Sequence, residues 1–113
     1  MSAITTHVLD TARGRPAAGI HVDLEMRADD SWRHIARAVT DADGRIRSLI
    51  ADAVPLDAGV YRLTYETEQY FQASNRAAFY PRVIVEFSVT SGESHYHVPL
   101  LLSPFGYTTY RGT

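Results

Sequence analysis

Alternation with a period of two is the pattern that most limits what this 113-residue chain can fold into. Apolar residues occupy every second position in 20–26, 61–65 and 83–89, and a period of two is typical of β-strands with one buried face. Less regular β-rich runs lie at 4–9, 32–40 and 95–102, with a weaker one at 107–111. Only Thr67–Asn75 shows the spacing of a helix, so we expect one short helix in an otherwise β chain.

Turn-forming residues separate these runs, for example the Asp-Ala-Asp-Gly segment 41–44 and the Ser-Gly-Glu segment 91–93. About eight short strands at regular spacing predict an all-β fold, a two-sheet antiparallel β-sandwich, in one domain that spans 1–113. The three leucines at 100–102 are apolar on both faces of their predicted strand. Either a second copy covers the outer side of this strand or the strand is central in its sheet, and both alternatives stay open.

The residue types that are missing limit the chemistry open to this chain. It contains no cysteine, and all 11 of its basic residues are arginine. The lack of cysteine excludes thiolate nucleophiles, disulfides and cysteine-ligated zinc, and the lack of lysine excludes Schiff-base chemistry and P-loop phosphate binding. An enzyme of this composition would work with histidine, arginine, carboxylates, hydroxyl groups and water.

Charge and hydropathy argue against nucleic acids and membranes as partners. The net charge is -2 and the isoelectric point is near 6.2, so we predict no basic surface for nucleic acid. No run approaches the roughly 18 apolar residues of a membrane-spanning helix, and 1–7 lack the charged and apolar regions of a secretory signal. We therefore expect a cytoplasmic location, with which the lack of cysteine agrees.

Histidine titrates near neutral pH, so the five histidines are the first candidates for catalysis. His95 and His97 are two positions apart, which places both rings on the same face of a strand. With His7 as a third ligand they would form a strand-borne zinc site, although no fourth ligand is evident. The alternative is two polar side chains on an exposed face. We expect His21 and His34 to be surface residues.

Two arginines and the chain end are further candidates for binding. Arg45 follows the turn at 41–44, and Arg47 points to the same side two residues later. A guanidinium group binds anionic or carbonyl-rich ligands bidentately, and the alternative is a solvated surface charge. Tyrosine and arginine among the last four residues, 110–113, favour a docked tail over the frayed end usual for termini. The residue patterns alone thus predict a β-sandwich with a candidate histidine–arginine site.

Both ends of the chain carry longer motifs. The segment 4–11 reads Ile-Thr-Thr-His-Val-Leu-Asp-Thr, followed by Gly-Arg-Pro-Ala at 14–17. The segment 95–104 reads His-Tyr-His-Val-Pro-Leu-Leu-Leu-Ser-Pro and continues through Phe-Gly-Tyr-Thr-Thr into Tyr-Arg-Gly. These motifs resemble the two signatures of the 5-hydroxyisourate hydrolases, transthyretin-related enzymes of urate breakdown. The segments 40–45, 61–63 and 79–81 also fit, so the resemblance covers essentially the whole chain.

The resemblance implies a fold and an assembly. The fold would be a transthyretin-like (prealbumin-like) sandwich of about eight strands with one short helix. The assembly would be a homotetramer, a dimer of dimers, with active sites in a channel at the interface between dimers. The strand at 95–102 and the terminal strand would line that interface.

The resemblance also implies a site and a reaction. The family's site residues correspond here to His7, Arg45, His97 and the tail residues Tyr110 and Arg111, with Gly112 following. At Thr113 this chain departs from the family, which usually has serine there, although threonine keeps the hydroxyl group. The implied reaction opens the six-membered ring of 5-hydroxyisourate at an amide bond and yields 2-oxo-4-hydroxy-4-carboxy-5-ureidoimidazoline.

The residue types present fit a hydrolysis by activated water without a covalent intermediate, metal or cofactor. His7 and His97 would transfer protons, in an order that the sequence does not decide, and His95 would at most position His97. Arg45 would stabilise the developing negative charge, while Tyr110, Arg111 and Thr113 would hold the substrate. The first rival is a transthyretin-like carrier of a small ligand without hydrolase activity, and the second is a zinc hydrolase.

Overall fold

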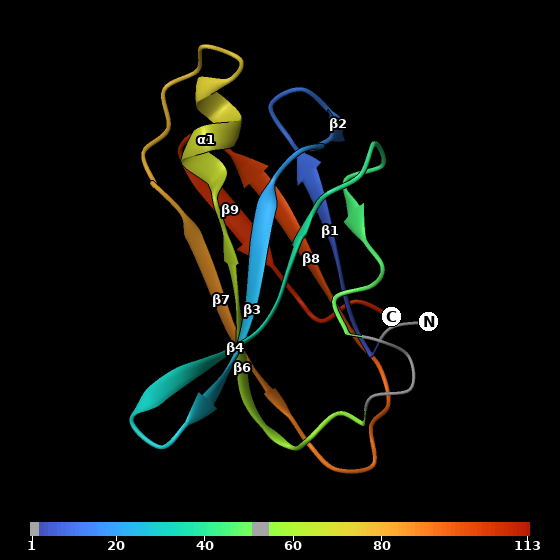
Figure 1. Cartoon of the computed structure of the whole chain (residues 1–113). Helices are drawn as coiled ribbons and strands as arrows, with labels where there is room; N and C mark the ends of the chain where they lie inside the picture. Colours follow the sequence, from blue (N-terminus) through green and yellow to red (C-terminus); the bar gives the residue numbers. More distant parts are fainter. Residues whose placement is uncertain (1–2, 51–54) are drawn as a thin grey trace.

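The computed structural model describes residues 3–50 and 55–113, which form two β-sheets packed face to face with a short helix at one end (Figure 1). The elements in chain order are β1 (Ile4–Asp10), β2 (Arg15–Pro16), β3 (His21–Ala28), β4 (Ser31–Val39), β5 (Arg45–Ile46), β6 (Gly59–Tyr65), α1 (Thr67–Gln72), β7 (Val83–Val89), β8 (Tyr96–Ser103) and β9 (Gly106–Thr109). The transthyretin-like β-sandwich that the sequence predicts is confirmed. No helix in the described residues is long and apolar enough to cross a membrane.

The strand order places the first and the last long strands next to each other. The first sheet has the order β2-β1-β8-β9, with β5 also paired to β1, and the second has the order β4-β3-β6-β7. All these pairs are antiparallel except β1 and β8, which are parallel. The predicted antiparallel β-sandwich therefore holds for every pair except this one, because alternation shows which face a strand buries but not its partner's direction.

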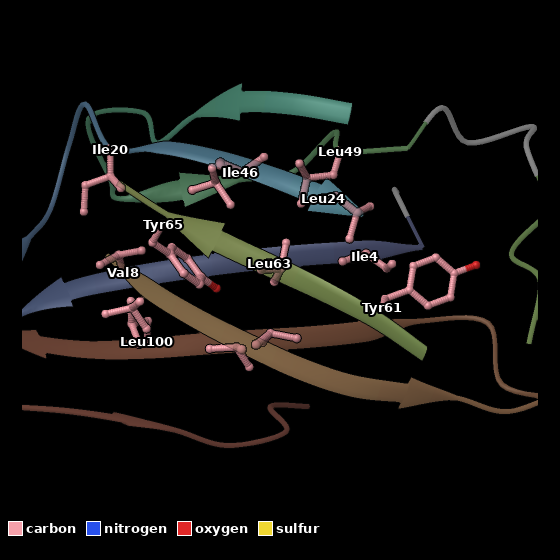
Figure 2. Close-up of a cluster of buried hydrophobic side chains, with 14 of the residues drawn as sticks. Ile4, Val8, Ile20, Leu24, Ile46, Leu49, Tyr61, Leu63, Tyr65 and Leu100 are labelled. Atoms are coloured by element: carbon pink, nitrogen blue, oxygen red, sulfur yellow. The ribbon is translucent and has the colours of Figure 1, made fainter. Parts of the chain in front are cut away.

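The core lies between the two sheets, where the alternating apolar side chains of both layers meet (Figure 2). In β7, Val83, Val85 and Val89 are buried while Ile84 is exposed, as the alternation predicts. The fully buried Tyr65 of β6 lies in the same core, and its hydroxyl group is 2.8 Å from Thr6 Oγ1. A buried hydroxyl needs such a partner, since leaving it unpaired costs about 1–3 kcal/mol.

The three leucines of β8 separate into two environments. Leu100 and Leu102 face the core and are almost completely buried, whereas Leu101 points to the outer face and is only partly buried. The strand lies between β1 and β9, so it is internal in its sheet. The central-strand alternative therefore explains two leucines, and Leu101 leaves apolar surface on the outer face.

The helix is shorter than the sequence predicts, since α1 ends at Gln72 and not at Asn75. Asn75 has a φ of 58°, a left-handed conformation in which asparagine often ends a helix. An ion pair then ties this end of the helix to β1. Arg76 Nη2 donates to Asp10 Oδ2 over 2.7 Å, and the hydroxyl of Tyr70 donates to the same oxygen over 2.7 Å.

Candidate active site

The outer face of the first sheet brings together three of the polar residues that the sequence singled out, His7, Arg45 and His97. We call it the histidine face, and its members are Thr5, His7, Arg45, His97 and Pro99. Thr5 and His7 alternate with the core-facing residues of β1, so both side chains lie on this face. Register pairs His7 with Arg45 of β5 on one side and with Pro99 of β8 on the other. The side chains of His7 and Arg45 are therefore direct neighbours on the adjacent strands β1 and β5.

A glycine makes the approach of β5 to β1 possible. Gly44 has a φ of 75°, which a residue with a side chain rarely adopts, and a Cβ there would collide with the Val8 carbonyl oxygen. Its own carbonyl accepts a hydrogen bond from Val8 N over 2.8 Å. Asp41 completes the turn, since its Oδ1 accepts from Arg45 N over 3.0 Å. The turn at 41–44 thus places Arg45 beside His7.

Thr5 links the two histidines at the start of β8. Its Oγ1 lies 2.8 Å from His97 Nδ1 and 3.3 Å from His95 Nε2. The parallel pairing of β1 with β8 sets Thr5 directly opposite His97, so both side chains stand on the histidine face. His95 and His97 share a side of the chain, as their spacing predicts, and one hydroxyl group contacts both rings.

The electrostatic environment keeps His97 neutral. Partial burial lowers the pKa of His97 below its ordinary value, and the nearby positive charge of Arg45 and the rings of His7 and His95 lower it further. A neutral imidazole has a lone pair with which to accept a proton, so His97 suits the role of a general base at pH 7. The same influences show that Arg45, His7 and His95 all lie within electrostatic reach of His97.

The chain end docks against the histidine face, as the residues at 110–113 predict. Gly112 N donates to the His97 carbonyl oxygen over 2.8 Å in an isolated antiparallel bridge. A Cβ on Gly112 would lie only 2.6 Å from His97 Cδ2 and 3.1 Å from Pro99 Cγ. Only glycine lets the tail lie this close to the imidazole ring. The tail therefore borders His97 on one side.

The other tail residues do not join the cluster in this chain. Because side chains alternate along the tail, Arg111 points away from His97, and its guanidinium carbon lies 4.5 Å from the centre of the Tyr96 ring. Arg111 Nη2 also approaches the His95 carbonyl oxygen at 3.4 Å. Tyr110 and Arg111 line a cavity of about 240 Å³ at the open edge between β7 and the tail. Tyr110 and Thr113 are exposed.

The remaining polar candidates are surface groups. Arg47 is exposed and donates to Asp41 Oδ2 over 3.0 Å, so it forms an ion pair beside the turn and does not join the cluster. His34 is exposed and lies 3.1 Å from Asp23 on the outer face of the second sheet, as predicted, and His21 is half-buried there. Within 3–50 and 55–113, no group of three or more histidine or carboxylate side chains is placed to hold a metal ion.

Thr5 is the site residue that the sequence did not single out. Its place two residues before His7 puts it on the same strand face, which is a signal available from alternation. Its contact with His97 depends on the pairing of strands that are about 90 residues apart in the chain. Nothing in the local pattern reveals that pairing.

The fold and the site together define a transthyretin-like β-sandwich with a histidine–arginine cluster on the outer face of one sheet. The model of the HIUase/Transthyretin family matches residues 4–112, and the chain belongs to this family.

Relatives with this fold include both hydrolases and transthyretins. The 5-hydroxyisourate hydrolase of Caulobacter vibrioides is 42% identical over 117 residues, a match that covers 100% of both chains. The structure of Klebsiella pneumoniae 5-hydroxyisourate hydrolase has a TM-score of 0.86 and 38% identity, and covers 99% of this chain and 100% of its own. Sea bream transthyretin in complex with thyroxine has a TM-score of 0.89 and 35% identity, over 98% of this chain and 95% of its own. The fold is therefore common to both kinds of relative.

Proposed function

We propose that this chain is a 5-hydroxyisourate hydrolase that opens the six-membered ring at an amide bond, a step of urate breakdown. The observation that carries the proposal is the cluster of His7, Arg45 and His97 on the histidine face. These three side chains supply a base, a second proton-transfer group and a fixed positive charge, which are the parts that amide hydrolysis by water requires. The hydrolases at 42% and 38% identity support the choice of substrate.

Water is the nucleophile in the proposed mechanism, since the chain has no cysteine or lysine to attack the carbonyl carbon. His97 takes a proton from this water, because its lowered pKa keeps the ring neutral at pH 7. The water oxygen bonds to the carbonyl carbon, the C–N bond breaks, and His7 delivers a proton to the departing ring nitrogen. The product is 2-oxo-4-hydroxy-4-carboxy-5-ureidoimidazoline.

Arg45 stabilises the negative charge that develops on the carbonyl oxygen. Its guanidinium group is always protonated and has several N–H donors in fixed geometry. The turn at 41–44 fixes its backbone beside β1, so little rearrangement is needed when the charge appears. Removal of one such donor in other enzymes costs about 10²–10³ in rate.

The chain end completes the substrate site in this proposal. Gly112 borders His97, and we assign Tyr110, Arg111 and Thr113 to substrate binding. Tyr110 and Thr113 are both exposed, so a substrate can reach them. To reach the substrate, Arg111 leaves the ring of Tyr96, a cation–π contact worth about 1 kcal/mol at an exposed site. It also gives up its contacts with the His95 carbonyl oxygen and the Glu93 carboxylate.

The proposed assembly is a homotetramer, a dimer of dimers, with the histidine face at an interface between dimers. Leu101, partly buried on this face, leaves apolar surface on the same strand as His97. The strands β7 and β9 are sheet edges, and free edges favour pairing with another chain. We also propose a cytoplasmic location, in agreement with the lack of cysteine.

The test is to generate 5-hydroxyisourate from urate with uricase and to follow its ultraviolet decay with and without the purified protein, both before and after treatment with EDTA. A hydrolase accelerates the decay, and we expect this activity to survive EDTA. A transthyretin-like carrier, the alternative function, would leave the decay at its spontaneous rate. Titration with thyroxine, the ligand in the sea bream transthyretin structure, tests the carrier function directly, since a carrier of this kind would bind it.

A further inference from the structure

The hydroxyl group of Thr5 has one proton and stands between two ring nitrogens. Its Oγ1 is 2.8 Å from His97 Nδ1 and 3.3 Å from His95 Nε2. A neutral imidazole has one nitrogen that donates and one that accepts, and the partner of one nitrogen decides the state of the other. Thr5 can give its proton to only one of the two rings, so its orientation couples their tautomers.

We infer that Thr5 is a positioning residue: its hydroxyl group holds His97 in the tautomer with a protonated Nδ1 and an unprotonated Nε2. In this arrangement His97 Nδ1–H donates to Thr5 Oγ1, and Thr5 Oγ1–H donates to His95 Nε2. The inference rests on the proposed function, in which His97 accepts a proton from water. It goes beyond that function by naming the group that selects the reactive nitrogen.

The opposite orientation would disable the base. If Thr5 donated to His97 Nδ1, the neutral ring would carry its proton on Nε2 and have no lone pair there. Within 3–50 and 55–113, His97 Nε2 has no hydrogen-bond partner, so it is the nitrogen left for water or substrate. His95 matters in this scheme as the acceptor that takes the Thr5 proton.

The position of Thr5 suits a fixed role. Thr5 is only 7% exposed, and β1 is hydrogen-bonded to β8 from Ile4 to Asp10. The hydroxyl group is therefore held in place beside the two rings. Arg45 also lies near His97, but a guanidinium group has no acceptor atom and cannot take the Nδ1 proton. The Thr5 hydroxyl is thus the neutral acceptor within reach.

Two threonine variants separate the hydroxyl group from the packing. Thr5→Val keeps the shape and removes the hydroxyl, while Thr5→Ser keeps the hydroxyl. We expect Thr5→Val to lower kcat by about tenfold with little change in KM, the equivalent of one net hydrogen bond. We expect Thr5→Ser to stay within about twofold of the wild type. Thr64→Val, on the outer face of the second sheet, is the matched control and should leave kcat unchanged.

The tautomer itself is measured by nitrogen-15 NMR of the histidine rings, with the His97 signals identified from their absence in a His97 variant. In the wild type and in Thr5→Ser we expect His97 to have a protonated Nδ1 and an unprotonated Nε2. In Thr5→Val we expect this tautomer preference to be lost. A wild-type His97 protonated on Nε2, or a Thr5→Val enzyme with full kcat, would overturn the inference. An inactive wild type would refute the proposed function instead, and the nitrogen signals would still report whether Thr5 selects the tautomer.

Discussion

Gly112 is the point at which the chain end touches the histidine face, so Gly112→Ala tests that contact directly. A Cβ on this residue would lie 2.6 Å from His97 Cδ2 and 3.1 Å from Pro99 Cγ. Carbon atoms pack at about 3.5–4.0 Å, so the tail has to retreat by roughly 1 Å or His97 has to turn. A retreat of this size would stretch the hydrogen bond from Gly112 N to the His97 carbonyl, now 2.8 Å, beyond bonding range.

A misplacement of about 1 Å at a positioned group typically costs about 10²-fold in rate. We therefore expect Gly112→Ala to lower kcat/KM for 5-hydroxyisourate by about 10²-fold, measured by the ultraviolet decay of the substrate. Thermal unfolding should change little, because the tail residues Tyr110, Arg111 and Thr113 are exposed.

Gly106→Ala is the matched control in the neighbouring strand. A Cβ on Gly106 would meet Ser103 Oγ at 3.8 Å, an ordinary contact, so this variant should keep kcat/KM within about twofold of the wild type. Wild-type kcat/KM in Gly112→Ala would show that the tail does not border the substrate, and would refute its place in the site.

Three further changes have expected outcomes. Asp10→Asn removes the buried partner of an arginine and should lower the free energy of unfolding in urea by about 3 kcal/mol, whereas Asp23→Asn in a surface pair should cost less than about 1 kcal/mol. Because the pKa of His97 is lowered and its neutral form is the base, kcat/KM should stay high down to about pH 6.5 and fall as pH drops through that lowered pKa. An acid limb centred above pH 7 would contradict this. Arg45→Gln should lower kcat/KM by about 10²-fold, while Arg47→Gln should have no effect on it, and equal losses would argue against the assignment.

Acid pH should also weaken the fold through Asp10. Burial raises the pKa of Asp10, but hydrogen bonds from Arg76 and Tyr70 outweigh burial and hold this pKa below its ordinary value. The ionised carboxylate therefore contributes stability that is fully present above the unfolded pKa of about 4 and is lost as pH falls through the folded pKa. Urea unfolding of the wild type and of Asp10→Asn at several acid pH values measures this contribution, which the variant should lack.

Alternation predicted the strands because one face of each is buried, and a strand's local pattern records that burial. The run at 83–89 coincides with β7, and the run at 61–65 lies within β6, which begins two residues earlier at Gly59. The parallel pairing of β1 with β8 was not predictable in this way, because a partner's direction depends on contacts far apart in the chain. The helix end was misplaced since Asn75 takes a left-handed conformation that the helical spacing does not reveal.

The candidate site was predictable in part. The resemblance named His7, Arg45 and His97, and the register of β1 with β5 and β8 brings them to one face. The placement of Arg111 over the Tyr96 ring was not predictable. It follows from the alternation of side chains along the tail, and the local sequence of the tail does not show which strand the tail docks on. Thr5 was missed for the same reason, since its partner His97 lies on a strand from the other end of the chain.

The most direct test of the proposed site compares two histidine variants in the ultraviolet decay assay. His97→Ala removes the proposed base, while His34→Ala removes an exposed histidine on the outer face of the second sheet. We predict that His97→Ala loses most of the turnover, by about 10²-fold or more, with the fold and oligomeric state unchanged. His34→Ala should hydrolyse 5-hydroxyisourate at the wild-type rate. Equal activity of both variants, or loss of activity in His97→Ala only through unfolding, would contradict a catalytic role for the histidine face.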